Sequence, residues 1–167
     1  MRTECVEYEG GLGSGVDWSN DSTVTTVQDT DAGVERILST YGVITVVGAS
    51  SVASKPAHYV PAYMQQHGWR IIPVNPHAEK ILGVPTFRTL GEVPEQVGLV
   101  NVFRPSCSTP EIAWQAVAVG ATALWLQLGI ASEESRAIAE EAGLLYVEDR
   151  CLIIEHRRFG WGAPPSP

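Results

Sequence analysis

Five short apolar runs alternate with helix-forming stretches from residue 29 onward, and this alternation limits the fold more than any other feature of the sequence. The runs are rich in β-branched and aromatic residues, as is typical of strands buried on both faces of a parallel sheet. They occupy residues 43–47, 69–74, 99–103, 123–128 and 144–147. Helical periodicity precedes the first run, separates most of the others and predicts a short helix after the last.

Capping residues and glycines mark the ends of these predicted helices. The candidate starts are Asp29 or Thr30, Pro56, Ser108 or Thr109 followed by Pro110, and Ser132; the candidate stops are Gly42, Gly68 and Gly143. Strands that alternate with helices pair in parallel through right-handed crossovers. The sequence therefore predicts an α/β fold over residues 29–160. We expect a single Rossmann-like domain, with a three-layer, doubly wound parallel sheet of about five strands, followed by a C-terminal tail over residues 161–167.

The negative charge of the chain is concentrated at its N-terminus. The net charge is -8, and residues 1–32 hold seven acids and one base, whereas residues 33–167 hold twelve acids and ten bases. We expect residues 1–28 to form a flexible acidic extension, because so polar a segment buries little surface. The overall acidity disfavours nucleic-acid partners and a membrane surface, which both select clustered basic residues.

The cysteines and the N-terminal sequence favour a cytoplasmic location. The three cysteines Cys5, Cys107 and Cys151 are few, odd in number and widely spaced, so we expect neither a disulfide framework nor a zinc site. The first eleven residues lack the basic-then-apolar order of a secretory signal. The four histidines have no spacing that predicts a metal site or a catalytic triad.

Ligands of open parallel sheets bind beyond the carboxyl ends of the strands. In this sequence those ends lead into residues 48–55, 75–76, 103–105, 127–130 and 149–151. Three of these segments carry a base, namely Lys55, Arg104 and Arg150. We therefore expect an edge of the sheet that binds phosphate groups.

The loop after the first strand resembles a dinucleotide fingerprint only in part. Aligned on Gly48, the second glycine of Gly-x-Gly-x-x-Gly is Ser50 and the third is Ala53. The second strand ends in Asn75 instead of the acidic residue that binds the ribose of NAD. These departures favour a phosphate site at a helix start and disfavour NAD, although an NAD(P)-binding oxidoreductase stays an alternative.

Six motifs in the same order make the sequence similar to the small stand-alone bacterial CoA-binding proteins. Their domain is similar to the amino-terminal domain of the succinyl-CoA synthetase alpha subunit. The motifs are Val46–Ser50, Lys55-Pro56 with Tyr59-Val60, Ile72–Pro76, Val102–Arg104, Trp125–Gly129 and Asp149–Cys151. The resemblance runs from about residue 36 to residue 158, so it covers nearly all of the predicted domain.

This resemblance implies a coenzyme A site and a role for each matching residue. The phosphates would lie on Gly48, Ala49, Ser50 and Ser51, with Lys55 beside them. The adenosine or its ribose phosphate would lie near Asn75 and Pro76, and Phe103 and Arg104 would border the nucleotide. The pantetheine arm would pass Gln127 and Gly129. Arg150 and Cys151 match the last motif of the family.

The function we expect is non-catalytic binding of coenzyme A or an acyl-CoA, with a homodimer or an acyl-CoA enzyme partner as the candidate assemblies. A subunit that supplies CoA specificity to a larger ligase or transferase is the second alternative. Cys151 has two interpretations: a buried core cysteine, which is the commoner situation, or a thiol that exchanges with the thiol of CoA. The chain is too short to include the second domain that a succinyl-CoA synthetase needs for catalysis.

Overall fold

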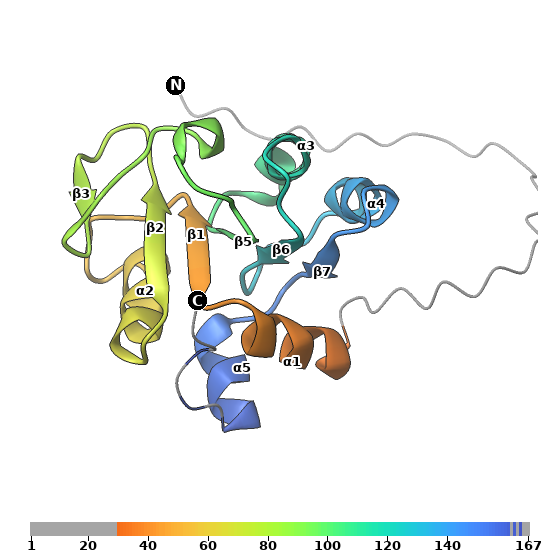
Figure 1. Ribbon diagram of the computed structural model, residues 1–167, viewed down its shortest axis with the longest axis horizontal. Coiled ribbons are helices and arrows are strands. Elements are labelled where there is room, and N and C mark those ends of the chain that lie inside the picture. The colour runs from red at the N-terminus through yellow and green to blue at the C-terminus, as the bar shows by residue number, and fades with distance from the viewer. Residues whose placement is uncertain (1–29, 161, 163, 165–167) are drawn as a thin grey trace, which may run out of the picture.

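The computed structural model describes residues 30–160, 162 and 164, so the predicted extension over residues 1–28 and most of the predicted tail lie outside the described residues. Figure 1 shows the elements in chain order, coloured from the N-terminus to the C-terminus. They are α1 (Asp31–Thr40), β1 (Val43–Val47), α2 (Pro56–Gln66), β2 (Arg70–Val74), β3 (Lys80–Ile81), β4 (Val84–Pro85), η1 (Leu90–Glu92), β5 (Leu99–Val102), η2 (Ser106–Ser108), α3 (Thr109–Ala118), β6 (Ala123–Leu126), α4 (Glu133–Glu141), β7 (Leu145–Val147) and α5 (Leu152–Phe159).

Five strands form one parallel sheet in the order β2-β1-β5-β6-β7, which confirms the predicted doubly wound α/β fold. The chain order reverses between β1 and β5, the switch point beside which ligands of such sheets bind. Four of the five strands are shorter than predicted: β2 and β7 begin one residue later, and β5 and β6 end earlier. Phe103 and Gln127 therefore belong to the loops beyond β5 and β6. These two loops therefore begin directly at the carboxyl ends of β5 and β6.

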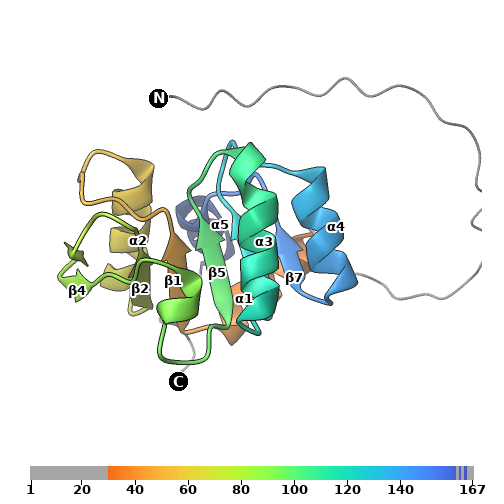
Figure 2. The ribbon, with the colours of Figure 1, turned by 90° about the horizontal axis from the view of Figure 1, so that it is seen from above.

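Helices cover both faces of the sheet and create two separate apolar cores, as Figure 2 shows from above. One core joins α1, α2 and α5 to the sheet and includes Ile37, Met64 and Trp125. The other joins α3 and α4 to the opposite face and includes Ile112 and Tyr146. All five of these side chains are nine-tenths or more buried, so burial on both faces accounts for the continuously apolar strands.

Two of the predicted helix caps are confirmed and one is not. Thr30 Oγ1 accepts a hydrogen bond from Gly33 N, and Ser132 accepts one from Ser135 N, both at 3.2 Å. Ser108 stands before α3 but forms no side-chain capping bond. Thr109 is the first residue of α3 and is buried, and its hydroxyl lies 2.7 Å from Ser135 Oγ on α4. Thr109 therefore connects two helices instead of capping one.

Glu148, which follows β7, connects the end of the sheet to α4. Its Oε2 accepts hydrogen bonds from Ser132 N at 2.9 Å and from the Tyr146 hydroxyl at 2.6 Å, and its Oε1 pairs with Arg136. Burial by itself would raise the pKa of Glu148, but these three donors lower the pKa below its ordinary value. We call this arrangement the Glu148 clamp.

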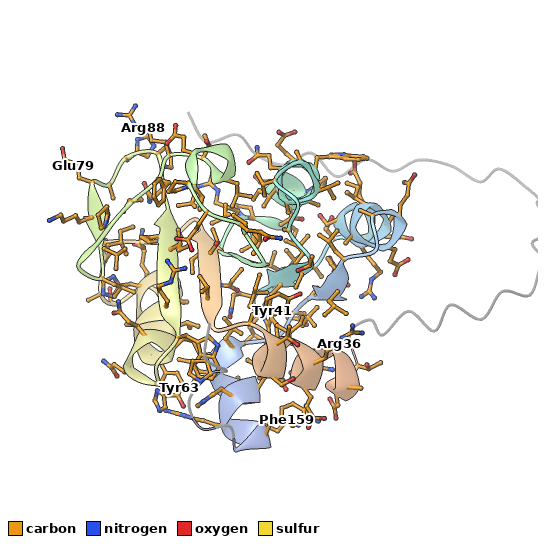
Figure 3. All side chains as sticks on the ribbon, in the orientation of Figure 1. Arg36, Tyr41, Tyr63, Glu79, Arg88 and Phe159 are labelled. Carbon is orange, nitrogen blue, oxygen red and sulfur yellow. The ribbon has the colours of Figure 1, made fainter. Side chains whose placement is uncertain are left out.

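Tyr63 connects α2 to α5, and Figure 3 labels it on α2. Its hydroxyl lies 3.0 Å from His156 Nδ1, and the Arg157 guanidinium lies 5.0 Å from the centre of its ring. His156 is buried, so this contact belongs to the packing between the two helices. The contact therefore holds the C-terminal half of α2 against the middle of α5.

Two features of the structure were not predicted. The antiparallel pair β3–β4 forms a small hairpin within a stretch expected to be a loop, and two-residue strands leave no readable periodicity. Cys107 is disulfide-bonded, against the expectation from the cysteine spacing. No helix within the described part of the chain has the length and apolar character needed to cross a membrane.

Candidate functional site

The loop after β1 begins at Gly48, where the backbone has a φ of +83°. A Cβ atom at this position would lie 2.7 Å from the carbonyl oxygen of Phe103 and 2.8 Å from Arg104 Cδ. Only glycine combines this conformation with so close an approach. The loops after β1 and β5 are therefore in direct contact, which brings together two segments that the sequence assigned to one site.

Ser50 organises the turn between β1 and α2. Its N–H donates to the Ala57 carbonyl at 3.0 Å, and its Oγ accepts from Val52 N at 3.1 Å, which leaves the hydroxyl proton available to a ligand. The N–H groups of Ser51 and Ala57 have no acceptor among residues 30–160. Free N–H groups at a helix start bind anions, so this turn has the donors that a phosphate requires.

Asn75 braces the same loop from β2. Its Nδ2 donates to the Ala49 carbonyl at 2.7 Å, and its Oδ1 accepts from His77 N at 2.8 Å and from Ala78 N at 3.1 Å. Asn75 was predicted to lie near the adenosine or its ribose phosphate. In the structure, both polar atoms of its side chain already form hydrogen bonds with the backbone. Ala49 is buried and belongs to the core, whereas Pro76 is exposed at the turn. An asparagine before a proline at a strand end is a turn signal that predicts this bracing.

A cavity of about 460 Å³ opens between the first turn of α2 and the loops after β5, β6 and β7. Five of the predicted site residues line it: Lys55, Phe103, Arg104, Gln127 and Cys151. The lining residues to which the sequence gave no site role are mostly apolar: Pro56, Ala57, Tyr59, Val60, Pro105, Leu128 and Ile130. Tyr59 and Leu128 are large apolar side chains that are 46% and 61% exposed, a pattern typical of a binding surface.

Lys55 and Arg104 lie at the rim of this cavity and are both exposed. Neither side chain forms an ion pair with a carboxylate in the part of the chain that the structure describes. Two uncompensated cations next to the free N–H groups of the turn create a local positive field, although the chain as a whole is acidic. The rim is therefore suited to a small polyanion.

A buried amide pair lies where β5 and β6 end. Gln127 is 2% exposed, lines the cavity and donates through Nε2 to Asn101 Oδ1 at 2.8 Å. No described residue donates to Gln127 Oε1, and Asn101 Nδ2 is buried without a partner. Sequence reasoning assigned no role to Asn101, although a polar residue inside a fully buried strand is a signal that predicts a special environment.

Gly129 and Arg150 fix the loops after β6 and β7 and do not line the cavity. Gly129 N donates to Asp149 Oδ1 at 2.6 Å, which joins the two loops. The Arg150 guanidinium lies 3.4 Å from carboxylate oxygens of Asp31 and Glu155. Asp31 also pairs with Arg158, whose hydrogen bond is the main reason that the pKa of Asp31 is lowered. Arg150 thus connects α1 to α5, a role that spacing along the sequence does not reveal.

Among the described residues there is no group of three His, Cys, Asp or Glu side chains that could hold a metal ion. A family described as a CoA binding domain matches residues 42–157. The chain belongs to this family. This finding confirms the resemblance inferred from the six motifs.

Several proteins are similar to this chain. "Uncharacterized protein YneT" of Bacillus subtilis is 34% identical over 125 residues, which are 75% of this chain and 93% of that protein. The solved structure of "cell-free ID.343" from Thermus thermophilus is 37% identical with a TM-score of 0.73, over 77% of this chain and 98% of that one. An acetate–CoA ligase (ADP-forming) II of Archaeoglobus fulgidus is 28% identical over 99 residues. The matched residues are 58% of this chain but only 15% of the ligase.

Proposed function

We propose that this protein binds coenzyme A, or an acyl-CoA, without catalysing a reaction of its own. The observation that carries the proposal is the cavity at the carboxyl edge of the sheet, whose rim holds Lys55 and Arg104, two cations that form no ion pair with a described carboxylate. CoA has an anionic end and a long, largely apolar arm, and this site has a cationic rim beside apolar walls. Membership of the CoA binding domain family supports the same ligand.

The anionic end of the ligand would lie on the turn between β1 and α2. There the N–H groups of Ser51 and Ala57 and the hydroxyl of Ser50 supply donors, and Lys55 and Arg104 supply charge. Hydrogen bonds to charged groups are about twice as strong as neutral ones, so these donors would provide most of the orientation. The arm would then enter the cavity between Phe103 and Gln127.

The end of the second strand disfavours NAD as the ligand. A dinucleotide site of this fold requires an acidic residue after the second strand to bind the ribose hydroxyls. Asn75 stands there, and its two polar atoms are bonded to the backbone of Ala49, His77 and Ala78. No side-chain acceptor is left at that position for a ribose diol.

A matched pair of arginine variants tests the site. Arg104→Ala removes a cation from the cavity rim, whereas Arg36→Ala removes one from α1, where Figure 3 labels it and where it lines no part of the cavity. Loss of a hydrogen bond to a charged group costs about 1.5–3 kcal/mol, so Arg104→Ala should weaken CoA binding about ten- to a hundredfold in calorimetric titration. Arg36→Ala should leave the affinity unchanged. Equal affinities in the wild type and both variants would remove this site assignment.

A second candidate function is the supply of a CoA site to a separate acyl-transferring enzyme. The similarity to one part of an acetate–CoA ligase favours it, because that part functions there within a longer chain. A pull-down from native extract with the wild-type protein as bait tests this candidate. Specific retention of a ligase or transferase subunit supports it, and retention of none contradicts it.

A further inference from the structure

Cys151 lines the cavity described above and is the free cysteine of the described chain. It occupies the position directly before α5, where its side chain forms no capping hydrogen bond. The residue is half-buried, so its sulfur is neither sealed in the core nor fully exposed. Cys107, by contrast, is already disulfide-bonded and offers no thiol.

The amide pair of Gln127 and Asn101 is a second feature that points to a ligand in this cavity. Gln127 lines the cavity together with Cys151, and only 2% of the residue is exposed. No described residue donates a hydrogen bond to its Oε1. Asn101 Nδ2, on the other side of the pair, also lacks a partner. Gln127 Oε1 is not among the buried atoms without a partner, so it is open to the cavity, where a bound molecule that carries an amide or thiol could donate a hydrogen bond to it.

We propose that Cys151 is a covalent capture site for the sulfur of a CoA-type thiol. This inference rests on the proposed function, because the ligand must first be bound with its arm in the cavity. A CoA whose phosphates lie at Lys55 and Arg104 would place its arm in the cavity that Cys151 and Gln127 also line. The protein then holds the captured CoA until a thiol releases it.

The capture step is a thiol–disulfide exchange, and the co-reactant is a mixed disulfide of CoA with another low-molecular-weight thiol. The Cys151 thiolate attacks the CoA sulfur, the disulfide bond of the small molecule breaks, and a new bond forms between Cys151 Sγ and that sulfur. The other thiol leaves as a thiolate and takes up a proton. Cys151 is oxidised and the departing thiol is reduced, so no further oxidant is needed.

The geometry of α5 favours this reaction at Cys151. The residue stands directly before an eight-residue helix, whose N-terminal end is the positive end of the helix dipole. The carboxylate of Glu155 in the first turn is compensated by Arg150 and Arg158. Because α5 packs against α2 through Tyr63 and His156, the helix that follows Cys151 is held against the helix whose first turn lines the cavity.

The test exposes the purified wild-type protein to the mixed disulfide of CoA and glutathione, and in parallel to glutathione disulfide. Acid quenching and peptide mapping by mass spectrometry then locate any adduct. We expect CoA on Cys151, formed about tenfold or more faster than the glutathione adduct, because binding raises the effective concentration of the reacting sulfur. S-methyl-CoA has no free thiol or disulfide and cannot exchange, so it should compete with the mixed disulfide for the cavity. At saturation it should slow formation of the CoA adduct about tenfold or more. Cys151→Ser should lose the adduct.

Calorimetric titration with S-methyl-CoA separates the two proposals, because this ligand tests binding without a reactive thiol. If S-methyl-CoA binds but Cys151 stays unmodified, or if both disulfides react at the same rate, the capture site is refuted and the proposed function stands. If S-methyl-CoA does not bind, the proposed function fails and the capture site fails with it. All arms except the variant use the wild-type chain, so a Cys151→Ser protein that fails to fold does not affect the outcome.

Discussion

Gly48→Ala should destabilise the protein through two separable effects. The first is conformational, because an alanine with the φ of +83° seen here pays about 1–2 kcal/mol for a left-handed backbone. The second is steric, because the new Cβ would lie 2.7 Å from the carbonyl oxygen of Phe103 and 2.8 Å from Arg104 Cδ. The arginine side chain can move, but the carbonyl belongs to the backbone of the loop after β5. Overpacking of this kind costs about 1–3 kcal/mol, so the total loss should be about 2–5 kcal/mol.

Gly120→Ala is the matched control for this variant. Gly120 has a φ of +74°, close to that of Gly48, but a Cβ there would meet nothing within 4 Å. It should therefore lose only the conformational part, about 1–2 kcal/mol. Urea unfolding curves of the wild type and both variants measure the difference. Equal losses in the two variants would refute the close approach of the β1 and β5 loops, on which the site assignment depends.

Three further substitutions test other parts of the account by urea unfolding. Asn75→Ala should lower the free energy of unfolding by about 1–3 kcal/mol, because three hydrogen bonds that brace the loop are lost. Asn75→Asp should lose less, because it keeps the two bonds in which the side chain accepts. Equal losses in the two variants would contradict the bracing. Glu148→Gln should cost about 1.5–3 kcal/mol by weakening the Glu148 clamp. The pKa of Glu148 is lower in the folded than in the unfolded chain, so its contribution is present above the ordinary value of 4.5 and is lost as the pH falls below it; an acid limb of stability that is identical in the variant would contradict this. Ser132→Ala should cost about 1 kcal/mol, whereas Ser108→Ala, at a helix start without a side-chain bond, should cost clearly less.

The strands and most helix ends were predictable because their signals are local. Continuous β-branched runs such as residues 43–47 follow from burial on both faces of the sheet, and Thr30 and Ser132 cap helices that start within three residues of them. The β3–β4 hairpin was not predicted, because strands of two residues have no periodicity to read. Ser108 and Thr109 are equally good caps by composition, and only the packing of α3 on α4 decides between them.

The site was predictable as a set of segments but not as a set of contacts. Sequence order together with parallel strands places Lys55, Arg104 and Gln127 at one edge, and the structure brings all three to one cavity. The ion pair between Arg150 and Asp31 was not predictable, because the two residues lie 119 positions apart in the chain. Asn101 was missed for the opposite reason: its neighbours are apolar, so the strand signal hides the one polar side chain that holds Gln127.

The central claim is that the cavity edged by Lys55 and Arg104 binds coenzyme A. Calorimetric titration of the wild-type protein with CoA and, separately, with NADH tests this claim most directly. We expect saturable binding of CoA and no measurable binding of NADH. The affinity for CoA should fall with added salt, because the anionic end of CoA contacts exposed cations. Binding of NADH without binding of CoA would contradict it.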